Sequence, residues 1–215
     1  MTEITLIRHG EVHADWRDRL YGGMDVPLSG EGEAQAWAVA RELREEVFDG
    51  VISSGLARAE FTAAILRSSR PDLVRIDRPK LAERSRGDWA GLSVDEIDAR
   101  HPGGSNLWRS SHGMFTPPGG ESVEQVFERV LGELDRLAGE YEHGAIAVVA
   151  HLWVVRCAVA AAIGLAPERV AHLAVPTSGR VRLSWHGHRA GQGRGALIEM
   201  RGTPKVLNED RAQRV

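Results

Sequence analysis

The feature that most constrains this chain is an uninterrupted apolar run near its start, residues 4–7, which ends abruptly in Arg8, His9 and Gly10. A run rich in branched residues and free of helix breakers is typical of a strand buried on both faces. In open α/β sheets, ligands bind beyond the carboxyl ends of such strands, and a glycine there lets the backbone approach a ligand closely. The run therefore predicts an Arg-His pair at a functional edge, and the alternative is a strand that simply stops before a turn.

The rest of the sequence alternates between extended and helical patterns, which predicts one α/β domain. The expected strands are 50–53, 73–76 and 144–150, with a closing hairpin from 180–185 and 196–200. The expected helices are 30–46, 56–67, 93–100, 122–140 and 152–163. Residues 101–119 hold three prolines and four glycines, so we expect a long loop there. We expect the domain to span 1–207 and the residues 208–215 to form a disordered tail.

Two more residues point to the same edge as His9. His151 follows the apolar strand 144–150, just as His9 follows the first strand. Arg58 falls in the first turn of the helix after strand 50–53, where backbone N–H groups favour an anion. The alternative for a single arginine among 25 is an ordinary solvated side chain.

Composition narrows the classes of function. The net charge of −3 provides no basic field that would recruit nucleic acid or an anionic membrane. The single cysteine, Cys157, excludes an internal disulfide and is expected in the core. The most apolar run, 157–165, is too short to span a bilayer, and the start shows no signal-peptide pattern. We therefore expect a cytoplasmic enzyme.

Separated segments of the chain, taken in order, resemble the histidine phosphatase superfamily, which includes the cofactor-dependent phosphoglycerate mutases. The matching segments are Leu6–Glu11, Asp25–Ser29 with Gly32, Ser53–Ala63, the acid segment Leu81-x-Glu83-x-x-x-Gly87-x-Trp89-x-Gly91, Pro118–Ser122, and the strand that ends in His151. The resemblance implies a three-layer α/β sandwich, in which helices flank a mostly parallel central sheet.

The resemblance also implies a mechanism. His9 would attack phosphorus and become a phosphohistidine, which splits one difficult displacement into two. Arg8, Arg58 and His151 would surround the phosphoryl oxygens, on which charge is spread during transfer. Glu83 would protonate the leaving alcohol and then activate water. Such a site needs neither a metal nor another cofactor. The implied substrate-binding residues are Arg8, Arg58, Asp15, Tyr21, Gly22, Leu152 and Trp153.

The sequence departs from the family pattern around the expected pocket. Asp15 stands where relatives carry asparagine, Val12 replaces a common serine or threonine, and Leu152-Trp153 follows His151 where relatives usually have glycine. An ionised aspartate cannot donate a hydrogen bond to phosphate, as asparagine does. Three arrangements avoid this conflict: Asp15 pairs with Arg17 or Arg19 outside the pocket, it is protonated, or it binds a hydroxyl or cationic group of the substrate. We expect the first or the third.

Five apolar residues bear on the kind of substrate. They either line one side of the pocket and select a bulky, aromatic or nucleoside-like group, or they belong to the core. These residues are Trp108, Met114, Phe115, Leu152 and Trp153.

The sequence leaves three hypotheses about the function open. The first is a phosphatase for a small organic phosphate monoester, which the short segment before Pro118 favours over a mutase that transfers the phosphoryl group. The second is a metallohydrolase, because His9, Glu11, His13 and Asp15 are rich in ligand types. The third is a degenerate member that binds a phosphorylated ligand without turnover. The sequence does not decide whether the chain forms a homodimer.

Overall fold

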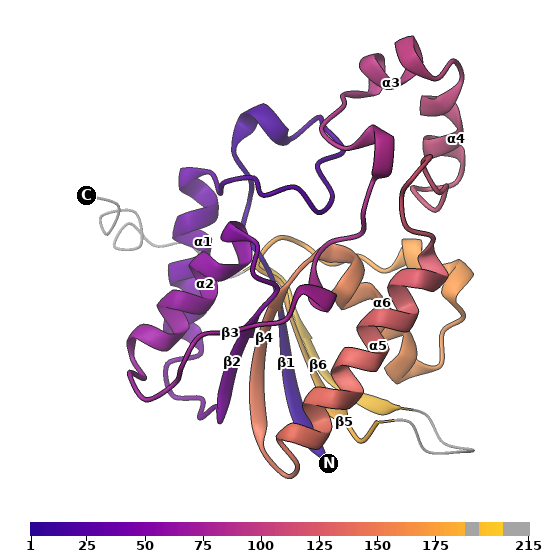
Figure 1. The fold of residues 1–215 in the computed structure, drawn as a ribbon. Helices are drawn as coiled ribbons and strands as arrows, with labels where there is room; N and C mark the ends of the chain where they lie inside the picture. Colours follow the sequence, from indigo (N-terminus) through magenta and orange to yellow (C-terminus); the bar gives the residue numbers. More distant parts are fainter. Residues whose placement is uncertain (188–193, 204–215) are drawn as a thin grey trace.

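The computed structural model describes residues 1–187 and 194–203, which include a six-stranded sheet in the order β3-β2-β4-β1-β5-β6 (Figure 1). Its strands are β1 (Thr2–Arg8), β2 (Gly50–Ser53), β3 (Ile76–Asp77), β4 (Ala145–Ala150), β5 (Arg180–Trp185) and β6 (Gly195–Arg201). The pairings among β1 to β4 are parallel, and the two that involve β5 are antiparallel. The predicted strands 50–53 and 144–150 and the closing pair of strands are confirmed. The predicted strand 73–76 is wrong in its bounds, because β3 comprises Ile76 and Asp77 and shares only Ile76 with it.

Helices cover both faces of the sheet, so the predicted three-layer α/β fold is confirmed (Figure 1). One layer contains α1 (Gly30–Glu42) and α2 (Ala57–Ser68), and the other contains α5 (Val123–Glu140) and α6 (Leu152–Ile163). The helices α3 (Val94–Arg100) and α4 (Gly104–Ser110) lie beyond the carboxyl ends of the strands. The structure also contains the short 3₁₀ helices η1 (Ala14–Trp16), η2 (Pro79–Leu81), η3 (Gly87–Trp89) and η4 (Pro167–His172).

The alternation of side chains along β1 explains why the first apolar run has no polar face. Leu6 points into the cluster that packs against α5 and α6, whereas Ile7 points into the cluster that packs against α1 and α2. Successive side chains of a strand face opposite sides of the sheet, so a strand covered on both sides must be apolar throughout. Both residues are fully buried.

Capping residues set several helix ends where the sequence predicts them. Ser29 caps α1, and Ser93 and Ser122 each form a capping box with Glu96 and Gln125 at the start of α3 and α5. Gly164 ends α6 with a φ of 68°, a left-handed conformation that suits glycine.

Two expectations about helices are wrong. Helix α1 ends at Glu42 instead of residue 46, because the chain turns at Leu43 and leaves Val47 75% exposed. The segment 101–119 is not a plain loop, since it contains α4. A Cβ on Gly104 would lie 2.9 Å from side-chain atoms of Ile97 and Trp89, so α4 packs directly on its neighbours. Tertiary packing stabilises this helix without an apolar period of its own.

Within 1–187 and 194–203, no helix is long and apolar enough to cross a membrane. The expected tail 208–215 and the expected domain end at 207 lie outside the described residues.

Candidate active site at the carboxyl ends of β1 and β4

His9 and His151 lie side by side because they follow two paired parallel strands. Arg8 of β1 is in register with Ala150 of β4, and the His9 N–H donates to the Ala150 carbonyl at 3.0 Å. The two imidazole rings are 5.1 Å apart between centroids, and both residues are at most 1% exposed. The sheet therefore brings both histidines to one edge, as the sequence predicts.

The hydrogen bonds of His9 determine where its proton lies. Its Nδ1 is 2.7 Å from the Gly10 carbonyl oxygen, which can only accept, so Nδ1 carries the hydrogen. Burial, together with the positive charges of Arg58 and Arg8, holds the pKa of His9 well below 6.5. The ring is therefore neutral near pH 7, with a free lone pair on Nε2.

His151 has a similar environment. Its Nε2 is 2.7 Å from the Ser54 hydroxyl, while its buried Nδ1 has no hydrogen-bond partner among the described residues. Burial and the nearby Arg58 lower its pKa well below 6.5. Ser54 lies just after β2, the strand on the other side of β4.

Two arginines supply positive charge beside the histidines. Arg58, at the start of α2, is fully buried, and its guanidinium donates to the carbonyls of Met24 at 2.6 Å and Gly22 at 2.7 Å. Arg8 donates to the Val175 carbonyl. The Nε atoms of both arginines are buried and have no partner in the described part of the chain. Burial lowers the pKa of each guanidinium, so an added anion would relieve a cost.

The start of α2 offers less to a ligand than its sequence suggests. The Ala57 N–H, one of the free donors of the first turn, is bound at 2.7 Å by the carboxylate of Asp25. The anion at this helix terminus is therefore supplied by the chain itself, and Arg58 remains the contribution of α2 to the edge.

Tyr21 and Gly22 contact Arg58. The Arg58 guanidinium carbon lies 5.2 Å from the centre of the Tyr21 ring, and the Gly22 carbonyl accepts one of its hydrogen bonds. Gly22 has a φ of +46°, and a Cβ there would come within 2.6 Å of Arg86 Cγ. The position therefore requires glycine. The geometry supports a role of both residues in holding Arg58, and their contact with substrate stays a prediction.

Glu83 is 7% exposed and lies near this cationic group, since its charge acts on Arg8, Arg58 and Arg86. One carboxylate oxygen accepts the Arg84 N–H at 2.8 Å and the Trp153 N–H at 3.4 Å. A groove of about 640 Å³ opens beside it, which we call the Glu83 groove. Its lining residues are Gly23, Met24, Pro79, Lys80, Ala82, Glu83, Ser85, Arg86, Ala90, Glu121 and Arg129.

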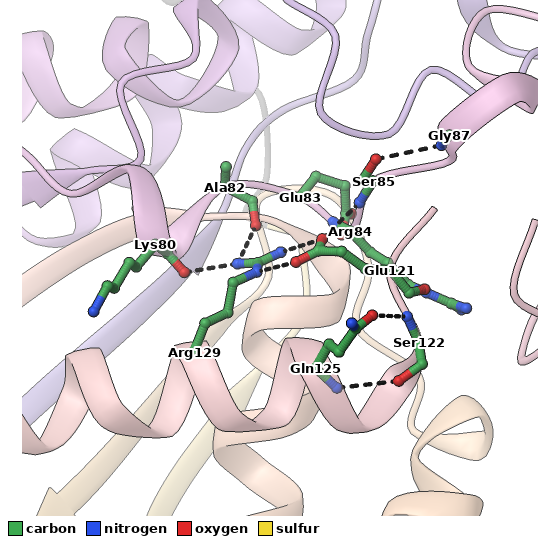
Figure 2. A network of polar contacts seen from close by, with 10 residues as sticks. All are labelled: Lys80, Ala82, Glu83, Arg84, Ser85, Gly87, Glu121, Ser122, Gln125 and Arg129. Atoms are coloured by element: carbon green, nitrogen blue, oxygen red, sulfur yellow. Dashed lines mark hydrogen bonds and ion pairs between the residues drawn. The ribbon is translucent and has the colours of Figure 1, made fainter. Parts of the chain in front are cut away.

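An ion pair behind Glu83 holds the segment that carries it (Figure 2). Arg129 of α5 binds both carboxylate oxygens of Glu121, at 2.6 and 2.9 Å. The same arginine donates to the carbonyls of Lys80 and Ala82, at 2.6 and 2.9 Å, and Glu121 accepts the Ser85 N–H at 2.8 Å. Burial alone would raise the pKa of Glu121, but the hydrogen bonds from Arg129 and Ser85 outweigh it and hold that pKa below its ordinary value.

Asp15 does not pair with either neighbouring arginine, so that expectation is wrong. Its carboxylate is 79% exposed and lies 3.3 Å from His13 Nδ1. Arg17 binds Glu11 at 2.6 Å and Arg19 binds Glu96 at 2.7 Å, so both have other carboxylate partners.

The four residues considered as metal ligands do not converge. His9 is buried and hydrogen-bonded to Gly10, Glu11 binds Arg17 and Ser29, and His13 and Asp15 pair with each other at the surface. Across the residues that the structure describes, no group of three or more His, Cys, Asp or Glu side chains has the geometry of a metal site.

The five apolar residues considered for the pocket pack mainly against other parts of the protein. Trp108 and Phe115 pack on Trp89 in a small cluster beneath α3 and α4. Met114 and Leu152 lie against the main core, and Trp153 is 2% exposed within it. The contact of Leu152 and Trp153 with substrate stays a prediction, and the Trp153 N–H donates to Glu83.

Sequence reasoning missed the roles of Ser54, Arg86, Glu121 and Arg129. Arg86 and Arg129 could not be told from the other arginines. Ser54 and Glu121 fall in segments that match the family pattern, but their partners are far away in the sequence.

Comparison with known proteins identifies the family. The model of the histidine phosphatase superfamily (branch 1) matches residues 4–192. The chain belongs to this superfamily. It is 30% identical over 165 residues to phosphoserine phosphatase 1 of Hydrogenobacter thermophilus, covering 77% of this chain and 78% of that protein. It is 34% identical over 171 residues to the glucosyl-3-phosphoglycerate phosphatase of Mycolicibacterium vanbaalenii, covering 75% and 74%.

A solved structure extends the likeness to nearly the whole chain. The alpha-ribazole phosphatase from Shigella flexneri matches with a TM-score of 0.81 at 27% identity, over 94% of this chain and 97% of that one. The protein is a phosphatase of the histidine phosphatase superfamily, and phosphate monoesters are the typical substrates of that family.

Proposed function

We propose that this histidine phosphatase hydrolyses the phosphate monoester of a small organic molecule through a phosphohistidine at His9. The observation that carries the proposal is the neutral, buried His9 with its Nδ1 hydrogen held by the Gly10 carbonyl. This arrangement leaves Nε2 as a nucleophile within the electrostatic influence of Arg58 and Arg8. The Nε2 lone pair attacks phosphorus, the bond to the leaving alcohol breaks, and water later displaces the histidine.

Two arginines and a neutral histidine around His9 support binding of the phosphoryl oxygens. Arg8, Arg58 and His151 each keep a buried nitrogen without a partner among the described residues. If the Ser54 hydroxyl donates to His151 Nε2, the hydrogen of this neutral ring is on Nδ1 and points to an unfilled acceptor position. Fixed donors of this kind stabilise the charge that spreads over the phosphoryl oxygens in the transition state.

Glu83 is the proposed acid and base. It lies at the edge of an open groove, within the influence of both arginines of the site. In the first step it would protonate the leaving alcohol, and in the second it would take a proton from the attacking water. The leaving alcohol would therefore lie in the Glu83 groove, and the phosphoryl group beside His9.

The proposed chemistry is metal-independent, because two guanidinium groups supply the positive charge that a metal ion supplies in other phosphatases, and neutral His151 adds a hydrogen-bond donor. The relatives named above act on phosphoserine, a glucosyl-3-phosphoglycerate and an alpha-ribazole phosphate by their names. These names support a small organic ester as the substrate without selecting one. We propose that the enzyme acts in the cytoplasm on such a metabolite.

The test is a panel of phosphate esters assayed for released orthophosphate, with and without EDTA. The proposal predicts turnover of at least one small ester and unchanged rates in EDTA. Loss of activity in EDTA that is restored by a divalent metal would contradict the metal-independent mechanism. Absence of turnover across the panel would favour the non-catalytic alternative, and recovery of an isomeric phosphate ester instead of orthophosphate would favour the mutase.

A further inference from the structure

Arg86 lies three residues after Glu83 and lines the same groove. Only 8% of the residue is exposed. Its guanidinium carbon is 4.8 Å from the centre of the Trp108 ring and 5.9 Å from that of Trp153. The guanidinium carbon therefore lies over two indole rings, which attract the cation without using its N–H donors for conventional hydrogen bonds.

That edge has no acceptor. Within the described part of the chain, the Arg86 guanidinium has neither a hydrogen bond nor an ion pair, and its Nη1 is fully buried without a partner. Arg84, two residues earlier, also lies over the Trp153 ring, at 4.8 Å, but it differs in its hydrogen bonds. It donates to the carbonyls of Glu121, Gly113 and Phe115, at 2.8, 2.8 and 3.0 Å. Arg84 therefore binds the protein itself, whereas Arg86 keeps its donors free.

An unpaired buried cation is costly, and native structures rarely retain one without a role. Burial lowers the pKa of Arg86, and the negative charge of Glu83 is the largest opposing influence. Glu83 nevertheless lies beyond ion-pair distance and is engaged by the N–H groups of Arg84 and Trp153. A second anion in the groove would satisfy the donors of Arg86. The attraction between this anion and Arg86 would offset the repulsion between the anion and Glu83.

We propose that Arg86 binds a carboxylate on the leaving-group part of the substrate, so that the preferred ester is an acidic alcohol phosphate. This inference rests on the proposed function, because Glu83 marks the leaving-group side only if it protonates the alcohol. The Arg86 guanidinium lines the groove beside the Glu83 carboxylate, and it therefore lies on the same side as the substituents of the leaving alcohol. Its planar N–H edge matches the two oxygens of a carboxylate. Lys80 lines the same groove and adds a second positive charge.

The test compares 3-phosphoglycerate with glycerol 3-phosphate, which differ in having a carboxylate or a CH₂OH group at the same position. Both are assayed with the wild type and with Arg86→Met, which keeps an unbranched apolar chain between the two indoles. We expect Arg86→Met to lower kcat/KM for 3-phosphoglycerate by about 30-fold, as for a lost charged hydrogen bond, mostly through KM. The value for glycerol 3-phosphate should stay within about threefold. Arg86→Lys should restore part of the loss, because it keeps the charge without the fork.

Other outcomes would overturn the inference. Equal losses on the two esters, with a lower Tm, would show that Arg86 only supports the fold. An unchanged preference in Arg86→Met would show that no carboxylate is bound there. If the wild type instead prefers a bisphosphate over both esters and Arg86→Met abolishes that preference, the bound anion is a phosphate and the carboxylate assignment is wrong. A wild type that hydrolyses neither these esters nor p-nitrophenyl phosphate would refute the proposed function itself, and this inference with it.

Discussion

Replacing Arg129 with methionine is expected to destabilise the fold and to impair Glu83 in particular. The change removes both hydrogen bonds to Glu121 and those to the carbonyls of Lys80 and Ala82. Glu121 would keep the Ser85 N–H but lose its counter-charge. The segment 80–85 would then lose the bonds that tie its Lys80 and Ala82 carbonyls to Arg129 of α5, and Glu83 lies within this segment (Figure 2).

The magnitude follows from how far the pair is buried. Removing one partner of a buried ion pair costs about 3–5 kcal/mol. The Arg129 and Glu121 side chains are 19% and 25% exposed, so solvent screens part of the interaction and the lower end, about 3 kcal/mol, applies. In a domain of this size each kcal/mol lowers Tm by about 2–4 °C, which gives a decrease of about 6–12 °C.

The assay combines thermal unfolding with turnover of two kinds of ester. Glu83 matters most when the leaving alcohol needs a proton, so Arg129→Met should slow an alkyl phosphate at least about 10-fold more than p-nitrophenyl phosphate. The control is Arg136→Met on the same helix. Arg136 is 60% exposed and pairs with Glu140 at 2.9 Å, and surface pairs contribute about 0–1 kcal/mol. If Arg129→Met has a Tm within about 2 °C of wild type, or slows both esters equally, the positioning role of Arg129 is refuted.

Three further predictions concern other residues of the site. Glu83→Gln should slow alkyl phosphates by two orders of magnitude or so while affecting p-nitrophenyl phosphate far less; equal slowing, measured by orthophosphate release, would contradict its role as an acid. The pKa values of His9 and His151 lie well below 6.5 in the folded chain, so the unfolded chain binds more protons and stability falls as pH drops below about 6.5. His151→Gln should reduce that slope by up to about 1.4 kcal/mol per pH unit in denaturant titrations between pH 7 and 5, and an unchanged slope would show that His151 does not titrate in this way. Asp15→Asn should change kcat/KM by less than about threefold on every ester, because among the described residues its exposed carboxylate pairs with His13 alone; a large loss in steady-state assays would place Asp15 in the catalytic machinery.

The elements that carry the two histidines were predictable because a strand covered on both faces must be apolar throughout. The runs ending at His9 and His151 satisfy that condition, and parallel pairing then brings their ends together. Helix α4 was not predictable, since it depends on close packing of Gly104 against Ile97 and Trp89. Helix α1 was predicted too long because Val47 continues the apolar spacing after the chain has turned.

Charged partners were the least predictable part of the site. Arg17 and Arg19 are close to Asp15 in sequence, yet each binds a glutamate that the fold brings nearer. Sequence proximity does not determine ion pairs between long side chains, because tertiary structure selects the partner. For the same reason the sequence did not indicate a role for Arg86. That its buried Nη1 has no partner among the described residues is evident only in the folded structure.

The most direct test of the central claim is to trap the phosphorylated enzyme. Brief reaction with ³²P-labelled substrate and an alkaline quench should leave an acid-labile, base-stable label on the peptide that contains His9, as expected for a phosphohistidine. His9→Ala should lose both the label and turnover, while Glu83→Gln should retain the label for longer, because water attack is slowed. A label on another residue, or full turnover by His9→Ala, would contradict the proposed mechanism.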